Sequence, residues 1–316
     1  MQLRDRVIYT LECNKGNYVS GQSIAELCGV SRSAVAKCIT ALKAEGYPIS
    51  SVNNLGHRLE PECDILSEAR ISAHFGEAAP EIQVFKSIDS TSTQAKRALN
   101  EGLNREAIFA SEHQTAGRGR RGKSFYSPDR SGLYFSCVLY PRVSLSDSAA
   151  LTSAAAVAVC KSLEKHTNTT PMIKWVNDIF IENKKVCGIL TEAVTDFESG
   201  SVQAVIVGIG INLTTEVFPD ELIGIAGSVG AKPDRCVLIA EIFKKLKELC
   251  EKLPDKSFMD DYRARSLVLG KTVSFTRNSV DYTASADFID DNGELSVTTS
   301  NGEKILLNSG EISVKL

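Results

Sequence analysis

The sequence predicts three parts: an N-terminal winged helix-turn-helix, a central α/β domain with a mixed sheet, and a small C-terminal antiparallel β-barrel. Residues 21–42 have apolar side chains at helical spacing on both sides of a glycine turn. Apolar strands and helices share residues 64–268, whereas residues 269–316 contain only short strands of alternating pattern. We therefore expect domains at 1–62, 64–268 and 269–316.

The first part resembles a DNA-binding supersecondary motif. In GQSIAELCGVSRSAVAKCITALKAEG, the apolar residues have the spacing of two short amphipathic helices. Gly29 lies at the turn, and Ser31 is placed to cap the second helix. This spacing is typical of a helix-turn-helix. YPISSVNNLGHRLE then predicts two strands around Asn53-Asn54, as in a wing. A helical hairpin that binds only protein is the alternative.

The charge of this part is nearly balanced. Residues 1–62 contain seven Lys and Arg and six Asp and Glu, a formal charge of +1. Contacts to DNA phosphates would therefore come from the second helix, where basic residues cluster. The residues expected to contact DNA are Ser31, Arg32, Ser33 and Lys37.

The central part predicts a sheet with helices on one or both of its faces. Helices are expected in ILSEARISAHF, STSTQAKRALNEG, LSDSAALTSAAAVAVCKSLEKHT, RCVLIAEIFKKLKELCEKL and FMDDYRARSL. Strands are expected in AIFASEHQT, GLYFSCVLYP, PMIKWVND, IFIENKKVCGILTEAV and VQAVIVGIGINL. The polar ENKK is the expected turn of a hairpin.

The last part consists of five short segments of alternating pattern: KTVSFT, DYTASADFID, ELSVTTS, KILLNS and EISVKL. Asp291-Asn292-Gly293 and Asn301-Gly302 are typical hairpin turns. These features predict the small barrel.

Composition places the chain among globular proteins. It has 316 residues, of which 43% are hydrophobic, and a net charge of −3, so neither nucleic acid nor membrane is indicated globally. No apolar run approaches the roughly 20 residues of a membrane helix, and MQLRDRVIYTLEC lacks the apolar core of a signal peptide. We expect a cytoplasmic protein without a membrane partner. The nine scattered cysteines predict reduced, mostly buried thiols and no metal site.

Residues 114–128, QTAGRGRRGKSFYSP, match two phosphate-binding patterns, G-x-G-x-x-G and G-x-x-x-x-G-K-[ST]. Both patterns hold phosphate only when they open a helix. Pro128 and Gly132 prevent a helix here, and a strand is expected at Leu133, so both matches are predicted to be accidental.

The loop still suits an anion. Its glycines allow close backbone approach, and arginine forks match phosphate and carboxylate oxygens. Its cations are Arg118, Arg120, Arg121 and Lys123. A solvated basic turn is the alternative.

The chain resembles the biotin protein ligases. Their glycine-arginine loop and later motifs correspond to GRGRRG (117–122), KWVND (174–178), KVCGILTE (185–192), IDSTS (88–92) and VGIGINL (207–213). The N-terminal helix-turn-helix and an SH3-like C-terminal barrel are similar to the bifunctional subgroup, which also represses biotin genes. Departures from the family pattern are Val176 in place of proline, Ser92 in place of asparagine and Phe125 in place of tryptophan.

The resemblance implies a two-step reaction. ATP and biotin form biotinyl-5'-AMP and pyrophosphate, and biotin then passes to a lysine of a biotin carboxyl carrier protein. Mg²⁺ would accompany the phosphates. The subgroup further implies operator DNA as a partner, a homodimer when the adenylate is bound, and biotin as both substrate and corepressor precursor.

The resemblance also implies roles for residues. The expected catalytic residues are Arg118, Asp178 and Lys185. Contacts to biotin are expected from Ser90, Thr91, Ser92, Gln114, Arg118, Gly119, Arg120 and Lys185. Contacts to ATP are expected from Arg118, Arg120, Arg121, Lys123, Asn177 and Asn212. Trp175, the only tryptophan, is expected to be buried against the sheet.

Two other functions remain open. A lipoate-type ligase performs the same acyl-adenylate chemistry on a related scaffold, but its glycine-rich motif differs and it normally lacks a DNA-binding domain. A ligand-sensing transcription regulator without catalysis is the second. The presence of Lys185 and of the whole loop favours a ligase over this regulator.

Overall fold

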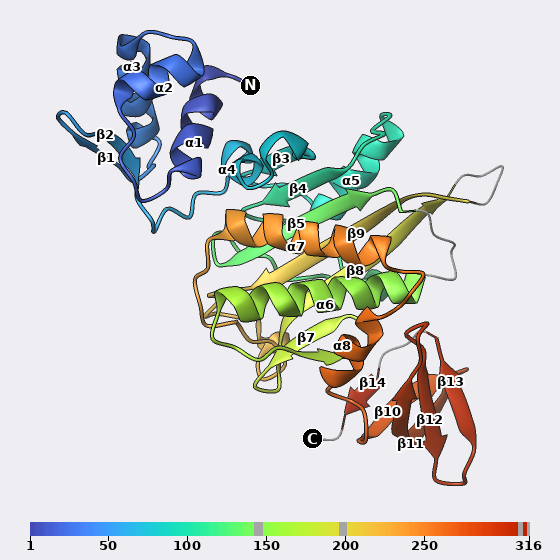
Figure 1. The fold of residues 1–316 in the computed structure, drawn as a ribbon. Coiled ribbons are helices and arrows are strands. Elements are labelled where there is room, and N and C mark those ends of the chain that lie inside the picture. Colours follow the sequence, from blue (N-terminus) through green and yellow to red (C-terminus); the bar gives the residue numbers. More distant parts are fainter. Residues whose placement is uncertain (142–147, 196–200, 309–311, 315–316) are drawn as a thin grey trace. The chain divides into compact units, whose positions relative to one another are not determined.

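The protein, described here by a computed structural model, divides into two compact units (Figure 1). The first comprises residues 1–84 and 233–240, and the second residues 85–232 and 241–316. Within them the structure describes residues 1–141, 148–195, 201–308 and 312–314. Helix α7 (Arg235–Glu251) begins in the first unit and ends in the second.

The first unit begins with the predicted winged helix-turn-helix. Its elements are α1 (Leu3–Cys13), α2 (Gly21–Cys28), α3 (Arg32–Ala44), β1 (Ile49–Val52) and β2 (Gly56–Leu59). Gly29 ends α2 at a φ of 59°, and the Ser31 hydroxyl accepts a hydrogen bond from the Ala34 amide. β1 and β2 pair antiparallel on either side of Asn54, whose φ is 66°. The predicted turn, cap and wing are all confirmed.

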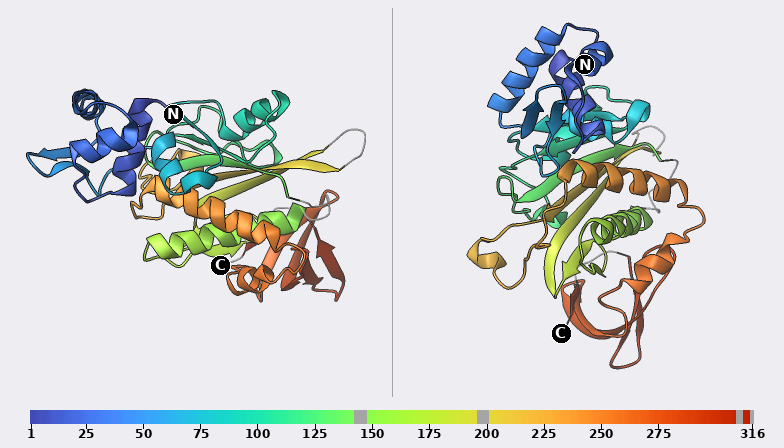
Figure 2. Two further views of the ribbon diagram at one scale, coloured as in Figure 1. Left: turned by 45° about the horizontal axis from the view of Figure 1, so that its top comes forward. Right: turned by 60° about the vertical axis from the view of Figure 1, so that its left-hand side comes forward.

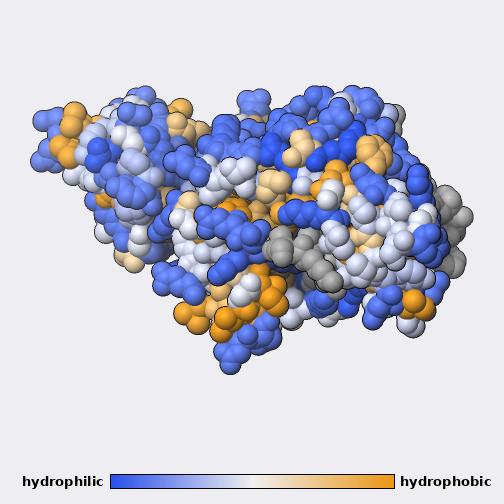
Figure 3. Space-filling model, turned by 90° about the horizontal axis from the view of Figure 1, so that it is seen from below, coloured by the Kyte–Doolittle hydropathy of each residue, from blue (hydrophilic) through white to orange (hydrophobic). Residues whose placement is uncertain are grey.

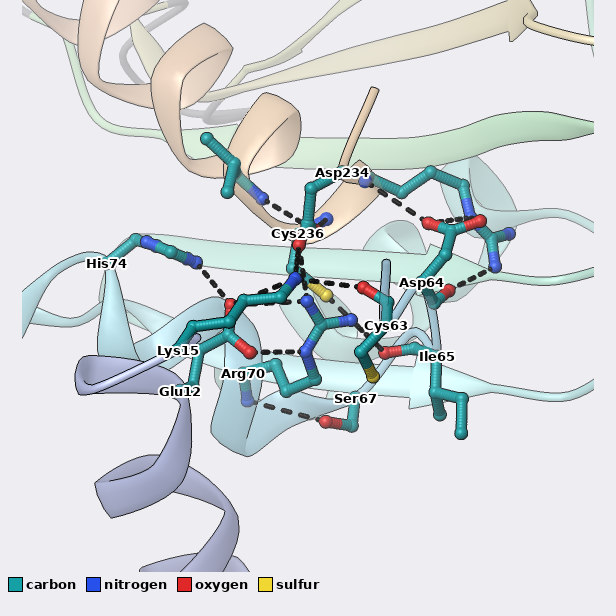
Figure 4. Close-up of polar contacts among 12 residues, drawn as sticks. Glu12, Lys15, Cys63, Asp64, Ile65, Ser67, Arg70, His74, Asp234 and Cys236 are labelled. Atoms are coloured by element: carbon teal, nitrogen blue, oxygen red, sulfur yellow. Dashed lines mark hydrogen bonds and ion pairs between the residues drawn. The ribbon is translucent and has the colours of Figure 1, made fainter. Parts of the chain in front are cut away.

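A buried network of charges joins distant parts of the first unit (Figure 4). After the wing come α4 (Glu68–Ala73), a 3₁₀ turn at Gly76–Ala78 and β3 (Glu81–Phe85), a strand that the sequence analysis did not predict. Arg70 in α4 is fully buried, and its guanidinium donates to Glu12 of α1 at 2.6 and 3.1 Å and to Asp234, just before α7. Lys15 also pairs with Asp234, and His74 with Glu12.

The network keeps its carboxyl groups ionised. Burial alone would raise the pKa of Glu12, but hydrogen bonds from His74 and Arg70 hold that pKa below its ordinary value. The pKa of Asp234 is lowered in the same way, because Arg70 and Lys15 outweigh burial. Each buried charge therefore has an opposite partner, which burial requires.

The second unit is built on antiparallel strands. β4 (Ala107–Ser111), β5 (Gly132–Leu139), β9 (Val202–Asn212), β8 (Lys184–Thr195), β7 (Asp178–Ile181) and β6 (Met172–Lys174) are neighbours in this order. The expected ENKK turn is confirmed, since Glu182 and Asn183 join β7 and β8 with φ values of 49° and 63°. Asp178 begins β7, whereas the sequence predicted that it would end the preceding strand.

Helices cover both faces of this sheet, as the predicted α/β class requires (Figure 2). α5 (Thr91–Asn100) lies on one face and α6 (Ser148–His166) on the other. β5 is buried along its whole length, which explains its nearly continuous apolar sequence.

The five C-terminal strands, expected to form a small barrel, form one antiparallel sheet after helix α8 (Phe258–Ala264). The strands are β10 (Thr272–Arg277), β11 (Val280–Ile289), β12 (Leu295–Thr299), β13 (Lys304–Leu307) and β14 (Ile312–Val314). Trp175 is buried, as expected, and its indole donates a 2.8 Å hydrogen bond to the Gly293 carbonyl in the β11–β12 turn. Arg263 of α8 pairs with Asp291 in the same turn. These contacts anchor the small sheet to the larger one.

The surface seen from below is mostly hydrophilic, with separate apolar patches (Figure 3). Among the described residues, no helix combines the length and the apolar character that a membrane crossing would need. All nine cysteines are free thiols and seven are buried, as the sequence predicted.

Replacing Arg70 with leucine is expected to lower the free energy of unfolding by about 3–5 kcal/mol, because the buried Glu12 carboxylate loses its bidentate guanidinium partner. Urea unfolding followed by circular dichroism measures the change. Arg4→Leu is the matched control, since Arg4 and its partner Glu45 are both exposed and such pairs contribute about 0–1 kcal/mol. Equal losses in the two variants would contradict the stabilising role of the buried network.

Candidate active site

A pocket of about 470 Å³ lies in the second unit where the glycine-arginine loop meets β8 and β9. Its lining combines hydroxyl and amide groups, apolar side chains and five cationic side chains: Arg118, Arg120, Lys123, Lys174 and Lys185. The lining residues that the sequence predicted are Ser90, Thr91, Ser92, Gln114, Arg118, Gly119, Arg120, Lys123, Asn177, Asp178 and Lys185. Segments far apart in the chain therefore meet in one cavity.

One part of the pocket is a chain of hydroxyl and amide groups at the start of α5. The Gln114 side-chain oxygen accepts from the Thr91 amide at 2.9 Å, and its nitrogen donates to the Ser127 hydroxyl at 2.9 Å. Ser136 of β5, which is fully buried, lies 2.8 Å from the Thr91 hydroxyl and 3.0 Å from that of Ser92. This chain fixes the side chains that a polar ligand would meet.

The glycine-arginine loop is a tight hairpin and opens no α-helix, which confirms the prediction that no helix starts here. The Gly119 amide donates to the Lys123 carbonyl at 2.7 Å, and the Phe125 amide to the Gly117 carbonyl at 2.9 Å. Arg121 lies in the turn with a φ of 54°. It is exposed there and does not line the pocket.

Three cations of the pocket contact oxygen atoms from residues 177–192. The Lys185 ammonium lies 2.7 Å from an Asp178 carboxylate oxygen, and Arg120 donates to the Asn177 side-chain oxygen at 3.1 Å. Arg118 donates to both carboxylate oxygens of Glu192, at 3.2 and 3.3 Å. The crowded positive charges are thereby offset and oriented.

Hydrogen bonds with Ile189 and Tyr262 hold the Asn177 turn in place. The Asn177 side chain donates to the Ile189 carbonyl at 2.9 Å, and the Ile189 amide donates to the Asn177 carbonyl. The Tyr262 hydroxyl donates to the Val176 carbonyl at 3.0 Å. Burial raises the pKa of Tyr262 well above its ordinary value, so the phenol stays protonated and remains a donor.

Glycines of β8 and β9 make room for the Phe125 ring, which forms an apolar wall of the pocket. A Cβ atom at Gly210 would lie 2.5 Å from this ring, and one at Gly188 would lie 3.2 Å from it. Glycine is required at Gly210 because of this close approach, which explains the glycine-rich VGIGINL segment. Further apolar lining residues are Trp175, Phe180, Ile189, Leu190, Ile209, Leu222, Ile225 and Ile312.

Asn212 ends β9 and does not line the pocket, but it is nearly fully buried. Its side-chain nitrogen donates to the Gly227 carbonyl at 3.1 Å, whereas its side-chain oxygen has no partner among the described residues. A buried acceptor without a donor is uncommon, so this oxygen is a candidate ligand contact.

The sequence analysis missed Ser127, Ser136 and Glu192. Ser136 lies within an otherwise apolar strand, so a hydroxyl there was a detectable signal. Glu192 belongs to KVCGILTE, but its contact with Arg118 spans 74 positions and has no local signature. Among the described residues, no cluster of His, Cys, Asp or Glu could hold a metal ion on its own.

In the first unit, α3 presents the residues expected to contact DNA. Val35, Ile39 and Leu42 face the core. The exposed side chains of this helix and its cap include Ser31, Arg32, Ser33 and Lys37. α3 therefore has one buried face and one free face that carries the cations.

The chain thus combines a helix-turn-helix with a pocket in which hydroxyl groups lie beside clustered cations. Residues 84–212 match the biotin/lipoate A/B protein ligase family, and residues 4–58 match a helix-turn-helix domain. The bifunctional ligase/repressor BirA of Bacillus spizizenii is 34% identical over 318 residues, which cover 96% of each chain. The BirA of Bacillus subtilis is 33% identical with the same coverage.

A solved structure of a biotin protein ligase is also similar to this chain. The biotin protein ligase from Aquifex aeolicus in complex with biotin and ATP is 27% identical, with a TM-score of 0.63. The match covers 74% of this chain and 98% of that one. The chain therefore belongs to the bifunctional ligase/repressor BirA family and is a biotin protein ligase that carries an N-terminal DNA-binding domain.

Gly117→Ala is expected to open the loop hairpin, because its Cβ would lie 2.4 Å from the Phe125 carbonyl oxygen. Overpacking of this kind costs about 1–3 kcal/mol. Gly119→Ala is the matched control, since its nearest neighbour, the Lys123 carbonyl oxygen, is 3.3 Å away. Limited trypsin digestion should cleave the loop faster in the Gly117 variant only. Equal cleavage of both variants would show that the close approach does not hold the hairpin.

Proposed function

We propose that the pocket binds biotin at its hydroxyl-rich part and ATP at its cationic part, and that the enzyme transfers biotin to a lysine of a biotin carboxyl carrier protein. The observation that supports this most is the position of neutral hydrogen-bonding groups and of cations in one cavity. Biotin has a neutral ureido ring at one end and a carboxylate at the other. Ser90, Thr91, Ser92 and Gln114 are the proposed contacts to the ureido ring.

The first step joins two anions, so positive charge is needed between them. A biotin carboxylate oxygen attacks the α-phosphorus of ATP, and pyrophosphate leaves. Arg118, Arg120 and Lys185 are the proposed cations at this position, with Gly119 allowing the backbone to approach. Asp178, through its 2.7 Å contact, orients the Lys185 ammonium. In the second step the acceptor amine attacks the acyl carbon, and AMP leaves.

The nucleotide is proposed to extend from the cations towards the end of β9. Lys123 and Asn177 line the pocket, and Arg121 at the hairpin tip could reach the phosphates if the loop closes. Asn212 does not line the pocket, so its buried side-chain oxygen would meet the adenine amino group only if the neighbouring Gly227 segment moves. Val217, Ile223 and Ile225, exposed at 77%, 66% and 58%, are apolar side chains suited to cover the base.

Mg²⁺ fits this arrangement if the phosphates supply most of its ligands. Asp178 is the only carboxylate among the described lining residues. Mg²⁺ is commonly held by one or two carboxylates, substrate phosphates and water. The metal would neutralise phosphate charge, while Lys185 and the arginines bind the reacting groups.

A lipoate-type ligase is the alternative within the same family. The lipoyl ring offers no hydrogen-bond donors, so the Gln114 and Ser136 chain would lack a polar ligand partner. Pockets built for hydrogen bonding reject analogues that cannot form those bonds. The hydroxyl chain therefore favours biotin.

Lys185→Ala is expected to slow adenylate formation by about 10²–10³-fold, because a charge that stabilises the transition state is lost. Biotin-dependent pyrophosphate release from ATP measures this rate, and lipoate and octanoate replace biotin in parallel assays. Lys184→Ala is the matched control, since this neighbouring lysine is exposed and does not line the pocket. An unchanged rate for the Lys185 variant would refute its role, and a preference for lipoate would refute biotin as the substrate.

We further propose that the first unit binds operator DNA as part of a homodimer and that the enzyme acts in the cytoplasm. A formal charge of +1 in residues 1–62 allows few phosphate contacts for one copy. Two copies related by a two-fold axis would place two α3 helices on a palindromic site. The loop at 117–124, closed over the adenylate, would couple ligand to dimer formation.

Biotin with ATP is expected to tighten operator binding by about 5–150-fold, the usual range of coupling between sites. Titration of operator DNA with and without both ligands, alongside sedimentation, measures this coupling. Arg32→Ala should weaken DNA binding without changing pyrophosphate release. A point variant is preferable to deletion of residues 1–62, because Glu12 and Lys15 pair with Arg70 and Asp234. Equal affinity with and without ligands would exclude the switch.

A further inference from the structure

Glu192 has two cationic partners at the border of the pocket. It lies in β8 two positions after Leu190, which lines the pocket, so both side chains point to the same face of the sheet. Its carboxylate accepts from both terminal nitrogens of Arg118, at 3.2 and 3.3 Å. Lys96 of α5 contacts it at 2.7 Å. Three separate elements thus meet at one carboxylate.

The contact occupies the part of Arg118 that a substrate acid would need. A guanidinium binds a carboxylate through two parallel N–H groups, and Glu192 accepts from both terminal nitrogens. Arg118 lines the pocket with its side chain 39% exposed, whereas that of Glu192 is 20% exposed. The arginine is therefore accessible to an incoming anion while its partner stays at the border.

We propose that Glu192 is an internal counter-ion that occupies Arg118 until the carboxylate of the substrate displaces it. The inference rests on the proposed contact between Arg118 and the biotin carboxylate. Every acid that reaches Arg118 must compete with Glu192, so an acid held only by its carboxylate binds weakly. An acid with further contacts, such as those to the Thr91 and Gln114 chain, can pay this cost. Glu192 is thus a specificity-determining residue.

Lys96 makes the exchange possible. When Arg118 turns to the substrate, Glu192 keeps its 2.7 Å contact with the Lys96 ammonium and is not left unpaired. A partly buried carboxylate without a partner would oppose the exchange. Lys96 therefore favours release of Arg118, whereas Glu192 opposes it.

Substitutions at Glu192 and at Lys96 are therefore expected to shift the KM for biotin in opposite directions. Glu192→Gln removes the competing charge, so the KM for biotin should fall about threefold, in line with the modest strength of exposed ion pairs. Lys96→Met keeps most of the side-chain volume but leaves Glu192 with Arg118 alone, so the KM should rise about threefold. The kcat of pyrophosphate release should change less than about twofold in both. Inhibition by octanoate, which has a carboxylate but no ureido ring, should strengthen in the Glu192 variant only.

The experiment uses the full chain and biotin-dependent pyrophosphate release at fixed ionic strength. KM shifts of the same sign in both variants, or octanoate inhibition unchanged in Glu192→Gln, would overturn the counter-ion role. Lys96→Gln replaces Lys96→Met if thermal unfolding shows that the methionine variant is not folded. Failure of the wild-type chain to release pyrophosphate with biotin would instead refute the proposed function. An active wild type with same-sign shifts refutes only the role of Glu192.

Discussion

Crowded cations in one pocket are the physical constraint on which the site depends. Without ligand they repel one another, and the structure offsets this repulsion with oxygen atoms from the segment that runs from the Asn177 turn into β8. Arg118, Arg120 and Lys185 each contact one such oxygen-bearing side chain: Glu192, Asn177 and Asp178. Arg120 and Lys185 are thereby oriented before any anion arrives, which reduces the reorganisation that the reaction requires, whereas Arg118 must exchange Glu192 for the substrate.

Glycines in the sheet make room for one wall of this pocket. β8 and β9 bring Gly188 and Gly210 opposite each other, and the Phe125 ring fills the space that their missing side chains leave. The same ring follows the loop hairpin directly, so the apolar wall and the cationic loop are fixed together. The loop thus has the sequence pattern of a phosphate-binding motif that opens a helix, but it forms a hairpin that packs on glycines of the sheet.

The first unit depends on a different electrostatic solution. Arg70 is fully buried, and the carboxylates of Glu12 and Asp234 make that burial possible. These three residues come from the helix-turn-helix region, from α4 and from the residue before α7, whose later part belongs to the second unit. Helix α7 therefore starts in the unit that carries the helix-turn-helix and ends in the unit that carries the pocket.

The sequence by itself determined what is encoded locally. Ser31 as a cap, Gly29 as a helix end, Glu182-Asn183 as a hairpin turn and the five C-terminal strands follow from propensities and short-range hydrogen bonds. The family resemblance indicated most of the residues that line the pocket. β3 was missed although polar and apolar residues alternate from Glu81 to Val84, because so short a segment is a weak signal. Asp178 was assigned to the wrong strand because a turn separates it from Lys174.

Only the tertiary structure decided which side chains meet. It placed Arg121 at a hairpin tip and Asn212 outside the pocket lining. It paired Arg118 with Glu192 and Glu12 with Arg70 across 74 and 58 positions. Such pairs depend on sheet order and helix packing, which no local pattern specifies. The sequence therefore indicated which types of side chain the site contains, whereas long-range contacts determine how each charged side chain is oriented.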